Sequence, residues 1–262
     1  MMMKFFHCYH LVTLSPWPLL VSMSVMYLML GVIFYFYKVS GGLLGLGVII
    51  FILVLIQWWR DVIRESMYQG VHLIKVIKGL RMSMLLFILS EVMFFISFFW
   101  VYFHMFLSPS VDIGNCWPPM SIEMFNPYSL PFLNTLLLLT SGVFITWGHY
   151  ELLLGEYSGG SYALKITLSL GAGFLFCQKM EYMGAYFTMS DSIYGAIFYL
   201  VTGFHGMHVI IGGLFLYVVS IRLNSMHLSK IHHFGFEAAA WYWHFVDIVW
   251  LFLYMFIYWL SY

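Results

Sequence analysis

Charge is what this sequence most clearly lacks. Asp, Glu, Lys and Arg make up 8% of its 262 residues, whereas 63% are hydrophobic. A soluble domain carries roughly 25% charged residues. The deficit excludes a water-facing surface over most of the chain and indicates that its solvent is mainly lipid. Because the formal net charge is zero, the chain also has no basic field for nucleic acid.

Motifs of common soluble enzymes are missing as well. The sequence has no phosphate-binding glycine loop, no nucleophile elbow and no Ser–His–Asp order. Its three cysteines, Cys8, Cys116 and Cys177, form no CxxC, so neither a disulfide framework nor a zinc site is indicated. The start, MMMKFFHCYH, has one Lys and no Arg. We therefore expect no cleaved signal or transit peptide, and insertion where the chain is made.

Long apolar runs are what the sequence has instead. A membrane-spanning helix needs roughly 20 apolar residues, and seven runs of about that length predict an all-α, polytopic membrane protein with a single membrane domain, 1–262. The second run continues past the membrane as an amphipathic segment. The predicted helices cover 16–37, 41–66, 81–107, 128–150, 162–186, 191–222 and 236–260.

Orientation follows from the Lys and Arg residues of alternate loops. Two lie on one side of the predicted membrane, Lys38 and Lys179. Nine lie on the side of the N-terminus: Lys4, Arg60, Arg64, Lys75, Lys78, Arg81, Lys165, Arg222 and Lys230. The bias predicts an N-terminus in the matrix or cytoplasm and a C-terminus opposite. This orientation argues against a seven-helix receptor, and the absence of Lys from 236–260 excludes a retinal Schiff base there.

Glu91 is the most informative single residue, since it falls in the middle of the third predicted span. Its helical neighbours Phe87, Ile88, Phe94 and Phe95 are apolar. A carboxylate there is expensive, so we expect it to be protonated, paired or facing a wet cavity. Two interpretations are open: a proton-responsive group, or a neutral acid that hydrogen-bonds to another helix.

Histidines and acids also enter spans six and seven. His205 and His208 share one helix face and could ligate a metal, but the nearby Gly203, Gly206, Gly212 and Gly213 favour close helix packing and structural hydrogen bonds. In span seven, His233 can meet Glu237, and His244 can meet Asp247, because they lie four and three residues apart. Such pairs lower the cost of polar groups in lipid or bind a neighbouring subunit.

A membrane boundary is predicted at the end of span two. The segment holds Trp58, Trp59, Arg60, Asp61, Arg64 and Glu65. Tryptophan favours the headgroup level, and arginine can bind lipid phosphate. The cluster is either an ordinary interfacial anchor or a specific lipid site.

Six segments that together cover most of the chain resemble subunit III of the haem–copper cytochrome c oxidases, mitochondrial type. They are HLVTLSPWPL, QWWRDVIRES, LRMSMLLFILSEVMFFISFFW, NTLLLLTSGVFITW, YGAIFYLVTGFHGMHVIIGG and HHFGFEAAAWYWHFVDIVWLFLYMFIYW. The resemblance implies a complex that passes electrons from cytochrome c to oxygen and pumps protons. It implies helices split into a two-helix and a five-helix bundle, with phospholipids in a V-shaped cleft between them.

The resemblance also implies partners and residue roles. Haem a and copper belong to partner subunits, and this chain is expected to hold no cofactor, no metal and no catalytic residue. Its expected partners are subunit I as the main contact, subunit II, accessory subunits and phospholipids, in the mitochondrial inner membrane. Lipid headgroups are expected near Trp58, Trp59, Arg64, Glu65, His72 and Arg222. Structural or proton-network roles are expected for Glu91, His205, His208, Glu237, His244 and Asp247, with Glu91 contacting His208.

Some positions depart from the family pattern: Cys8, Tyr150, Gly184 and Tyr186. The last two put the geometry of an external loop, about 184–190, in doubt. Three alternatives stay open: subunit III of a related quinol oxidase, a di-metal membrane enzyme built on Glu91, His205, His208 and groups of span seven, and a transporter. A transporter is disfavoured because the sequence shows neither repeated halves nor discontinuous helices.

Overall fold

A computed structural model describes residues 9–111, 114–120 and 122–262, so Cys8 and Lys4 lie outside the described residues. Seven helices in this part of the chain are long and apolar enough to cross a membrane, which confirms the predicted all-α membrane fold. They are α1 (Trp17–Phe36), α2 (Gly42–Met67), α3 (Ile74–Leu107), α4 (Leu130–Leu154), α5 (Tyr157–Met183), α6 (Ile193–Asn224) and α7 (Phe234–Leu253), which a π-helical turn, η2 (Tyr254–Trp259), continues.

Helix ends differ from the predicted ones where polar residues extend a helix beyond its apolar part. The third helix begins at Ile74 rather than 81, because Lys75, Lys78 and Arg81 are good helix formers. Likewise α4 runs on to Leu154 and α5 starts at Tyr157 instead of 162. Hydropathy predicts the apolar part of a helix, and residues with high helix propensity extend the helix beyond that part.

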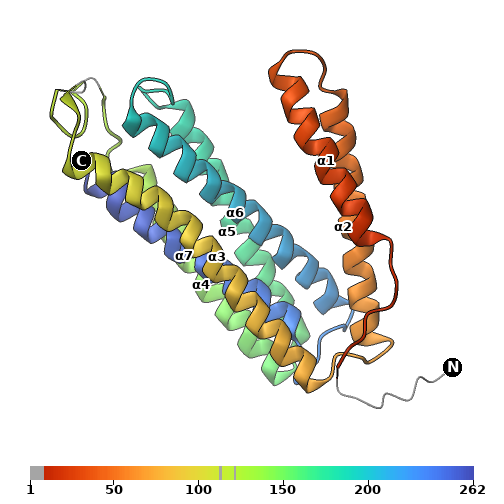
Figure 1. The fold of residues 1–262 in the computed structure, drawn as a ribbon. Helices are drawn as coiled ribbons and strands as arrows, with labels where there is room; N and C mark the ends of the chain where they lie inside the picture. The colour runs from red at the N-terminus through yellow and green to blue at the C-terminus, as the bar shows by residue number, and fades with distance from the viewer. Residues whose placement is uncertain (1–8, 112–113, 121) are drawn as a thin grey trace. The chain divides into compact units, whose positions relative to one another are not determined.

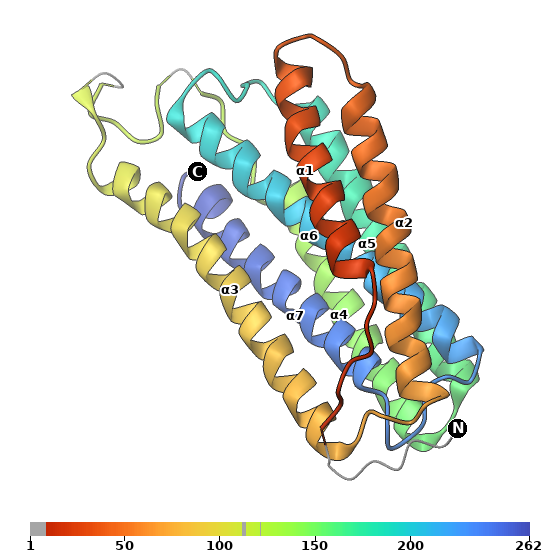
Figure 2. The ribbon, with the colours of Figure 1, turned by 45° about the vertical axis from the view of Figure 1, so that its right-hand side comes forward.

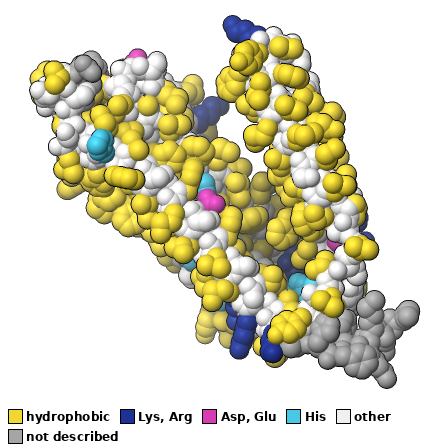
Figure 3. Space-filling view, in the orientation of Figure 1, with side chains coloured by type: hydrophobic (Ala, Val, Ile, Leu, Met, Phe, Trp, Pro, Cys, Tyr) yellow, Lys and Arg dark blue, Asp and Glu magenta, His cyan; other side chains and the backbone are white. Residues whose placement is uncertain are grey.

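The chain divides into two compact units, in agreement with the expected grouping of two and five helices. The two-helix unit, the residues up to Leu80, holds α1, α2 and about the first two turns of α3; the five-helix unit is Arg81–Tyr262. Figures 1 and 2 show α1 and α2 side by side as a hairpin. Apolar side chains cover most of the visible surface of both units, and charged ones occupy only small areas (Figure 3).

Glycine brings the backbones of the hairpin close together. A Cβ at Gly31 would collide with the backbone of Leu44, and one at Gly47 would meet the backbone of Tyr27 and Leu28. The buried residues of α1 are Ser24 and Gly31, and those of α2 are Gly47 and Val54. The hairpin therefore packs through small residues and leaves its large side chains on the outside.

Aromatic side chains build the core of the five-helix unit. Trp243, Trp250 and Phe174 are fully buried, and Phe174 meets Trp250 edge-on at 4.8 Å between ring centroids. Rings also join α3 to α6 and α7, as in Phe94–Phe204 at 5.1 Å and Phe95–Phe245 at 6.1 Å.

The predicted packing role of the span-six glycines is correct only in part. A side chain at Gly212 would press on Trp243 and Tyr242, so this glycine does admit α7. Gly206 and Gly213 face open space in the part of the chain that the structure describes, and Gly203 only touches the Tyr182 hydroxyl at 4.0 Å. These three positions lie on other faces of α6, so glycine spacing alone did not identify the packed face.

Loop contacts fix several helix ends of the five-helix unit. Gly155 ends α4 with a left-handed φ of 89°, and the Lys230 ammonium donates to the carbonyl of Leu154 at 2.5 Å. At the other end of the unit, Ser192 caps α6 by accepting from the Gly195 N–H. In the segment 184–190, the Tyr199 hydroxyl donates to the Phe187 carbonyl at 2.9 Å and Thr188 N–H donates to Asp191, so this loop is tied to α6.

Candidate functional site

The predicted contact between Glu91 and His208 is confirmed. Glu91 Oε2 on α3 lies 2.9 Å from His208 Nε2 on α6. The Glu91 side chain is 24% exposed and the His208 side chain 10%, so the rest of the chain covers most of the pair. The contact gives the carboxyl group a hydrogen-bond partner, which lowers the cost of placing it in an apolar helix.

Hydrogen bonding restricts the protons of this pair. His208 Nδ1 lies 2.7 Å from the Phe204 carbonyl, which can only accept, so Nδ1 carries a proton. A hydrogen bond between Nε2 and the Glu91 carboxyl group requires one further proton, carried by either the acid or the imidazole.

His205 is directed elsewhere. Its Nε2 donates to the Val246 carbonyl of α7 at 3.1 Å, and its ring packs between Phe174 and Trp250. Its Nδ1 is buried with no partner among the described residues. His205 and His208 therefore bind different helices, as expected for structural hydrogen bonding. Among the described residues, the groups of three or more ligand atoms that could hold a metal do not include Glu91, His205 or His208.

Asp247 and His244 lie along α7 beside α4. His244 Nδ1 is 3.8 Å from Asp247 Oδ2, so the predicted pair is close but longer than a hydrogen bond. Gly142 of α4 leaves room for the Asp247 carboxyl group, whose Oδ1 has no partner in the described part of the chain. Together they line a shallow groove between the two helices.

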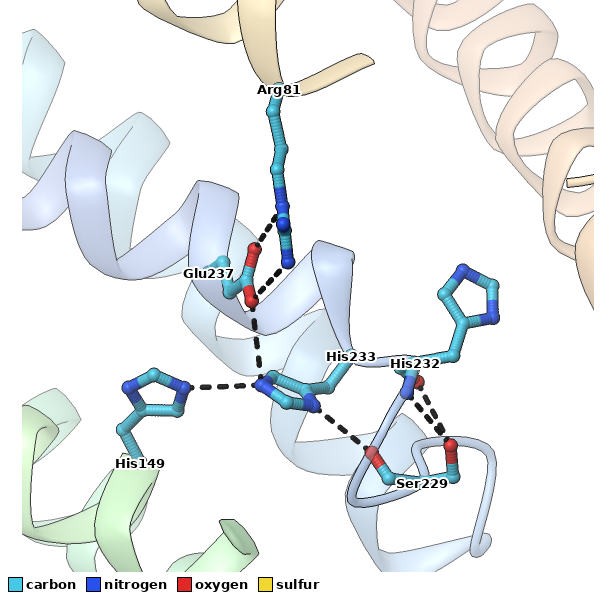
Figure 4. Close-up of polar contacts among 6 residues, drawn as sticks. All are labelled: Arg81, His149, Ser229, His232, His233 and Glu237. Carbon is cyan, nitrogen blue, oxygen red and sulfur yellow. Dashed lines mark hydrogen bonds and ion pairs between the residues drawn. The ribbon is translucent and has the colours of Figure 1, made fainter. Parts of the chain in front are cut away.

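Glu237 belongs to a polar cluster at the start of α7, drawn in Figure 4. Arg81 of α3 binds its carboxylate through two hydrogen bonds of 2.7 and 2.8 Å. His233 Nε2 lies 3.4 Å from Glu237 Oε1, as the spacing predicted, and 3.2 Å from Nε2 of His149 on α4. His232 points away from these groups (Figure 4). Burial, and then the charge of Arg222, lower the pKa of His232.

The predicted lipid residues of the two-helix unit lie at one end of the hairpin. Trp59 and Arg64 of α2 are exposed, and Trp58 is half-buried. Glu65 Oε2 contacts His10 Nε2 at 3.1 Å, and the rings of His10 and His72 are 6.0 Å apart. Trp17 donates to Asp61 at 2.8 Å and fixes the start of α1 against α2.

Arg222 belongs to the five-helix unit, at the end of α6. It is half-buried, its Nε has no partner among the described residues, and its guanidinium lies so close to Gly235 that a side chain there would collide with it.

Several functional candidates were missed from the sequence: Arg81, His149, Gln178 and Glu181. Arg81 and Glu237 are 156 residues apart, and His149 and His233 are 84 apart, so no local pattern joins them. Gln178 and Glu181 are buried on one face of α5 with side-chain atoms that have no partner in the described residues. Their three-residue spacing inside an apolar run was the available signal.

Comparison with known proteins agrees with these observations. The family model described as cytochrome c oxidase subunit III matches residues 7–262. Curated proteins named cytochrome c oxidase subunit 3 are 53% identical in Drosophila yakuba and 53% identical in Ovis aries, in each case over 97% of both chains. The protein of Anopheles gambiae is 51% identical over the same shares. This chain therefore belongs to the cytochrome c oxidase subunit III family.

Proposed function

We propose that this chain is a core subunit of a mitochondrial cytochrome c oxidase, and that it retains phospholipid at its two-helix unit and supports proton uptake through Glu91. The names of its insect and mammalian relatives favour this oxidase over a quinol oxidase. Haem a and copper reside in partner subunits. The chain packs mainly on subunit I, with subunit II and accessory subunits nearby.

The chain's orientation is part of the proposal. Because Lys and Arg residues favour the side on which a membrane protein is made, the N-terminus lies in the matrix and the C-terminus in the intermembrane space. The indoles of Trp58 and Trp59 then lie at the matrix-side headgroups, and Arg64 and His72 contribute to the same headgroup region. Arg222 contributes a second cation at that level of the five-helix unit.

The observation that carries lipid binding is the exposure of the hairpin. Its apolar sides carry Leu, Ile and Val side chains that are exposed in the described part of the chain, and its polar end carries an exposed guanidinium, Arg64, and an exposed indole, Trp59. Acyl chains fit such a surface, and a phosphate fits the guanidinium.

Matched variants of the purified complex test this proposal. Arg64→Gln removes the cation at the indole end, whereas Lys38→Gln removes an exposed cation in the turn at the other end of the hairpin. We expect native mass spectrometry to find at least one fewer retained phospholipid in Arg64→Gln and an unchanged number in Lys38→Gln. Equal lipid content in both variants and the parent would refute a lipid site at Arg64.

Purification in mild detergent tests the wider assignment. A core subunit co-purifies with haem a and copper-containing partners. The alternative di-metal enzyme purifies alone with its own metal, and that outcome would overturn the assignment to an oxidase.

A further inference from the structure

The polar cluster of Figure 4, at the end of the five-helix unit where α4 and α7 meet, contains several side chains of the kinds that bind metal ions. His149, His233 and Glu237 each offer one potential ligand atom, and these atoms all lie within 4.8 Å of one another. His233 is buried, while His149 and Glu237 are half-buried. The three groups come from two helices and the loop before α7, so the fold itself holds them together.

Hydrogen bonding prepares His233 as a ligand. Its Nδ1 lies 3.0 Å from the Ser229 carbonyl and must donate to it. The lone pair of a neutral His233 is therefore on Nε2, the atom that faces His149 and Glu237. A backbone carbonyl on the remote nitrogen is the usual support of a metal-binding histidine. His149 becomes a ligand when its proton moves from Nε2 to Nδ1.

Two of the three distances between the ligand atoms suit a small tetrahedral ion. Bonds of about 2.0–2.1 Å from zinc to nitrogen or oxygen place two ligand atoms of a regular tetrahedron about 3.3 Å apart. His233 Nε2 lies 3.2 Å from His149 Nε2 and 3.4 Å from Glu237 Oε1. Two imidazoles and one carboxylate also leave the fourth position of the ion open to water. Imidazole donors select zinc and its transition-metal neighbours over magnesium and calcium.

Arg81 makes the site exchangeable rather than permanent. Its guanidinium occupies both oxygens of Glu237, and its side chain is 44% exposed, so it can withdraw into water. Without a metal it neutralises the carboxylate; with one it competes for the same oxygens. The other triad in the described residues, His10, Glu65 and His72, is half-buried throughout.

We propose that His149, His233 and Glu237 form a binding site for an exchangeable divalent transition-metal ion, Zn²⁺ in particular, with Arg81 as the cation that the metal displaces. The bound ion would tie α4 to the start of α7. The proposal adds a reversible ligand to a subunit that holds no redox centre.

Zinc binding to the intact, chelator-washed oxidase complex tests the proposal. The probe is Zn²⁺ alone, measured by equilibrium dialysis in His233→Gln and in His232→Gln, the adjacent histidine whose ring points away (Figure 4). We expect His233→Gln to bind this equivalent of zinc at least about tenfold more weakly, since even supporting residues of metal sites contribute that much. His232→Gln should bind as the parent does. Equal binding by all three complexes would overturn the proposal.

Two further measurements make the result independent of how His233→Gln folds. Zinc-edge X-ray absorption of the parent complex should show two imidazoles and an oxygen ligand for the added ion, and a spectrum without imidazole would refute the site. Arg81→Gln should bind zinc more tightly, by up to about fivefold, the most that an exposed ion pair usually contributes. Weaker binding by Arg81→Gln would contradict the competing role of Arg81.

Discussion

The helices within each of the two units are held together by different contacts. In the two-helix unit, glycines let two backbones touch, and hardly any large side chain is buried. In the five-helix unit, buried aromatic rings and hydrogen bonds between helices do the same work, as with Trp243 Nε1 donating to Ser141 Oγ at 2.8 Å. Lipid gives apolar helices little reason to associate, so each unit needs close packing or polar contacts. The hairpin relies on close packing along its length, with the Trp17–Asp61 hydrogen bond at one end, and the five-helix unit uses both along its length.

The largest effect is expected from a side chain at Gly31. In Gly31→Leu the added atoms would enter the backbone of α2 at Leu44, so the helices of the hairpin must separate. We expect little assembled oxidase, measured as haem a absorbance per membrane protein. Gly31→Ala should retain some assembly but cost about 1–3 kcal/mol, the usual cost of overpacking.

Gly45→Leu is the matched control, because a Cβ at Gly45 meets nothing within 4 Å. Normal assembly of Gly31→Leu would show that the hairpin does not depend on backbone contact, and the contrast between the units would fail.

The second prediction concerns Glu91 in the five-helix unit. In a neutral His208, Nε2 needs a hydrogen-bond donor, because Nδ1 carries the proton that is donated to the Phe204 carbonyl. The amide of Glu91→Gln supplies one, whereas Glu91→Leu leaves a partly buried nitrogen unsatisfied. We expect Glu91→Leu to lose about 1–3 kcal/mol, measured as resistance of the complex to subunit loss in detergent, and Glu91→Gln to be close to the parent.

Turnover then separates the two interpretations of Glu91. Since Gln holds no transferable proton, Glu91→Gln should lower the rate of proton uptake if the pair moves protons, and Ser90→Ala, on the exposed side of the same turn, should not. Unchanged uptake in a stable Glu91→Gln complex would leave Glu91 a structural acid.

The seven spans, and the need of Glu91 for a polar partner, could be predicted because apolar length and an isolated intramembrane charge are local signals. The choice of His208 as that partner came with the family resemblance. The hairpin glycines were missed, since Gly31 and Gly47 look like any other glycine until the facing backbone is known. The cluster of Arg81, His149 and Glu237 was missed for a related reason. Each of these residues satisfies its polar groups with a distant part of the chain, and one sequence does not record such pairings.

The smallest effect is expected from a comparison of two buried serines, one in each unit. Ser24 and Ser141 are both 0% exposed, and each donates to the carbonyl three residues before it, at 2.7 and 2.6 Å. Ser141 alone also accepts the Trp243 indole N–H from another helix. We expect Ser141→Ala to cost about 0.6 kcal/mol, and at most about 1.7, as for other hydrogen bonds between membrane helices.

Ser24→Ala should be nearly neutral, because its carbonyl partner keeps its helical hydrogen bond. Thermal unfolding of the two purified variants measures the difference between their losses of stability. Both variants lose a buried hydroxyl, so that contribution cancels. The remaining difference reports the hydrogen bond between α4 and α7. If the two substitutions cost the same, hydrogen bonding between helices does not distinguish the five-helix unit, and its stability must come from ring packing alone.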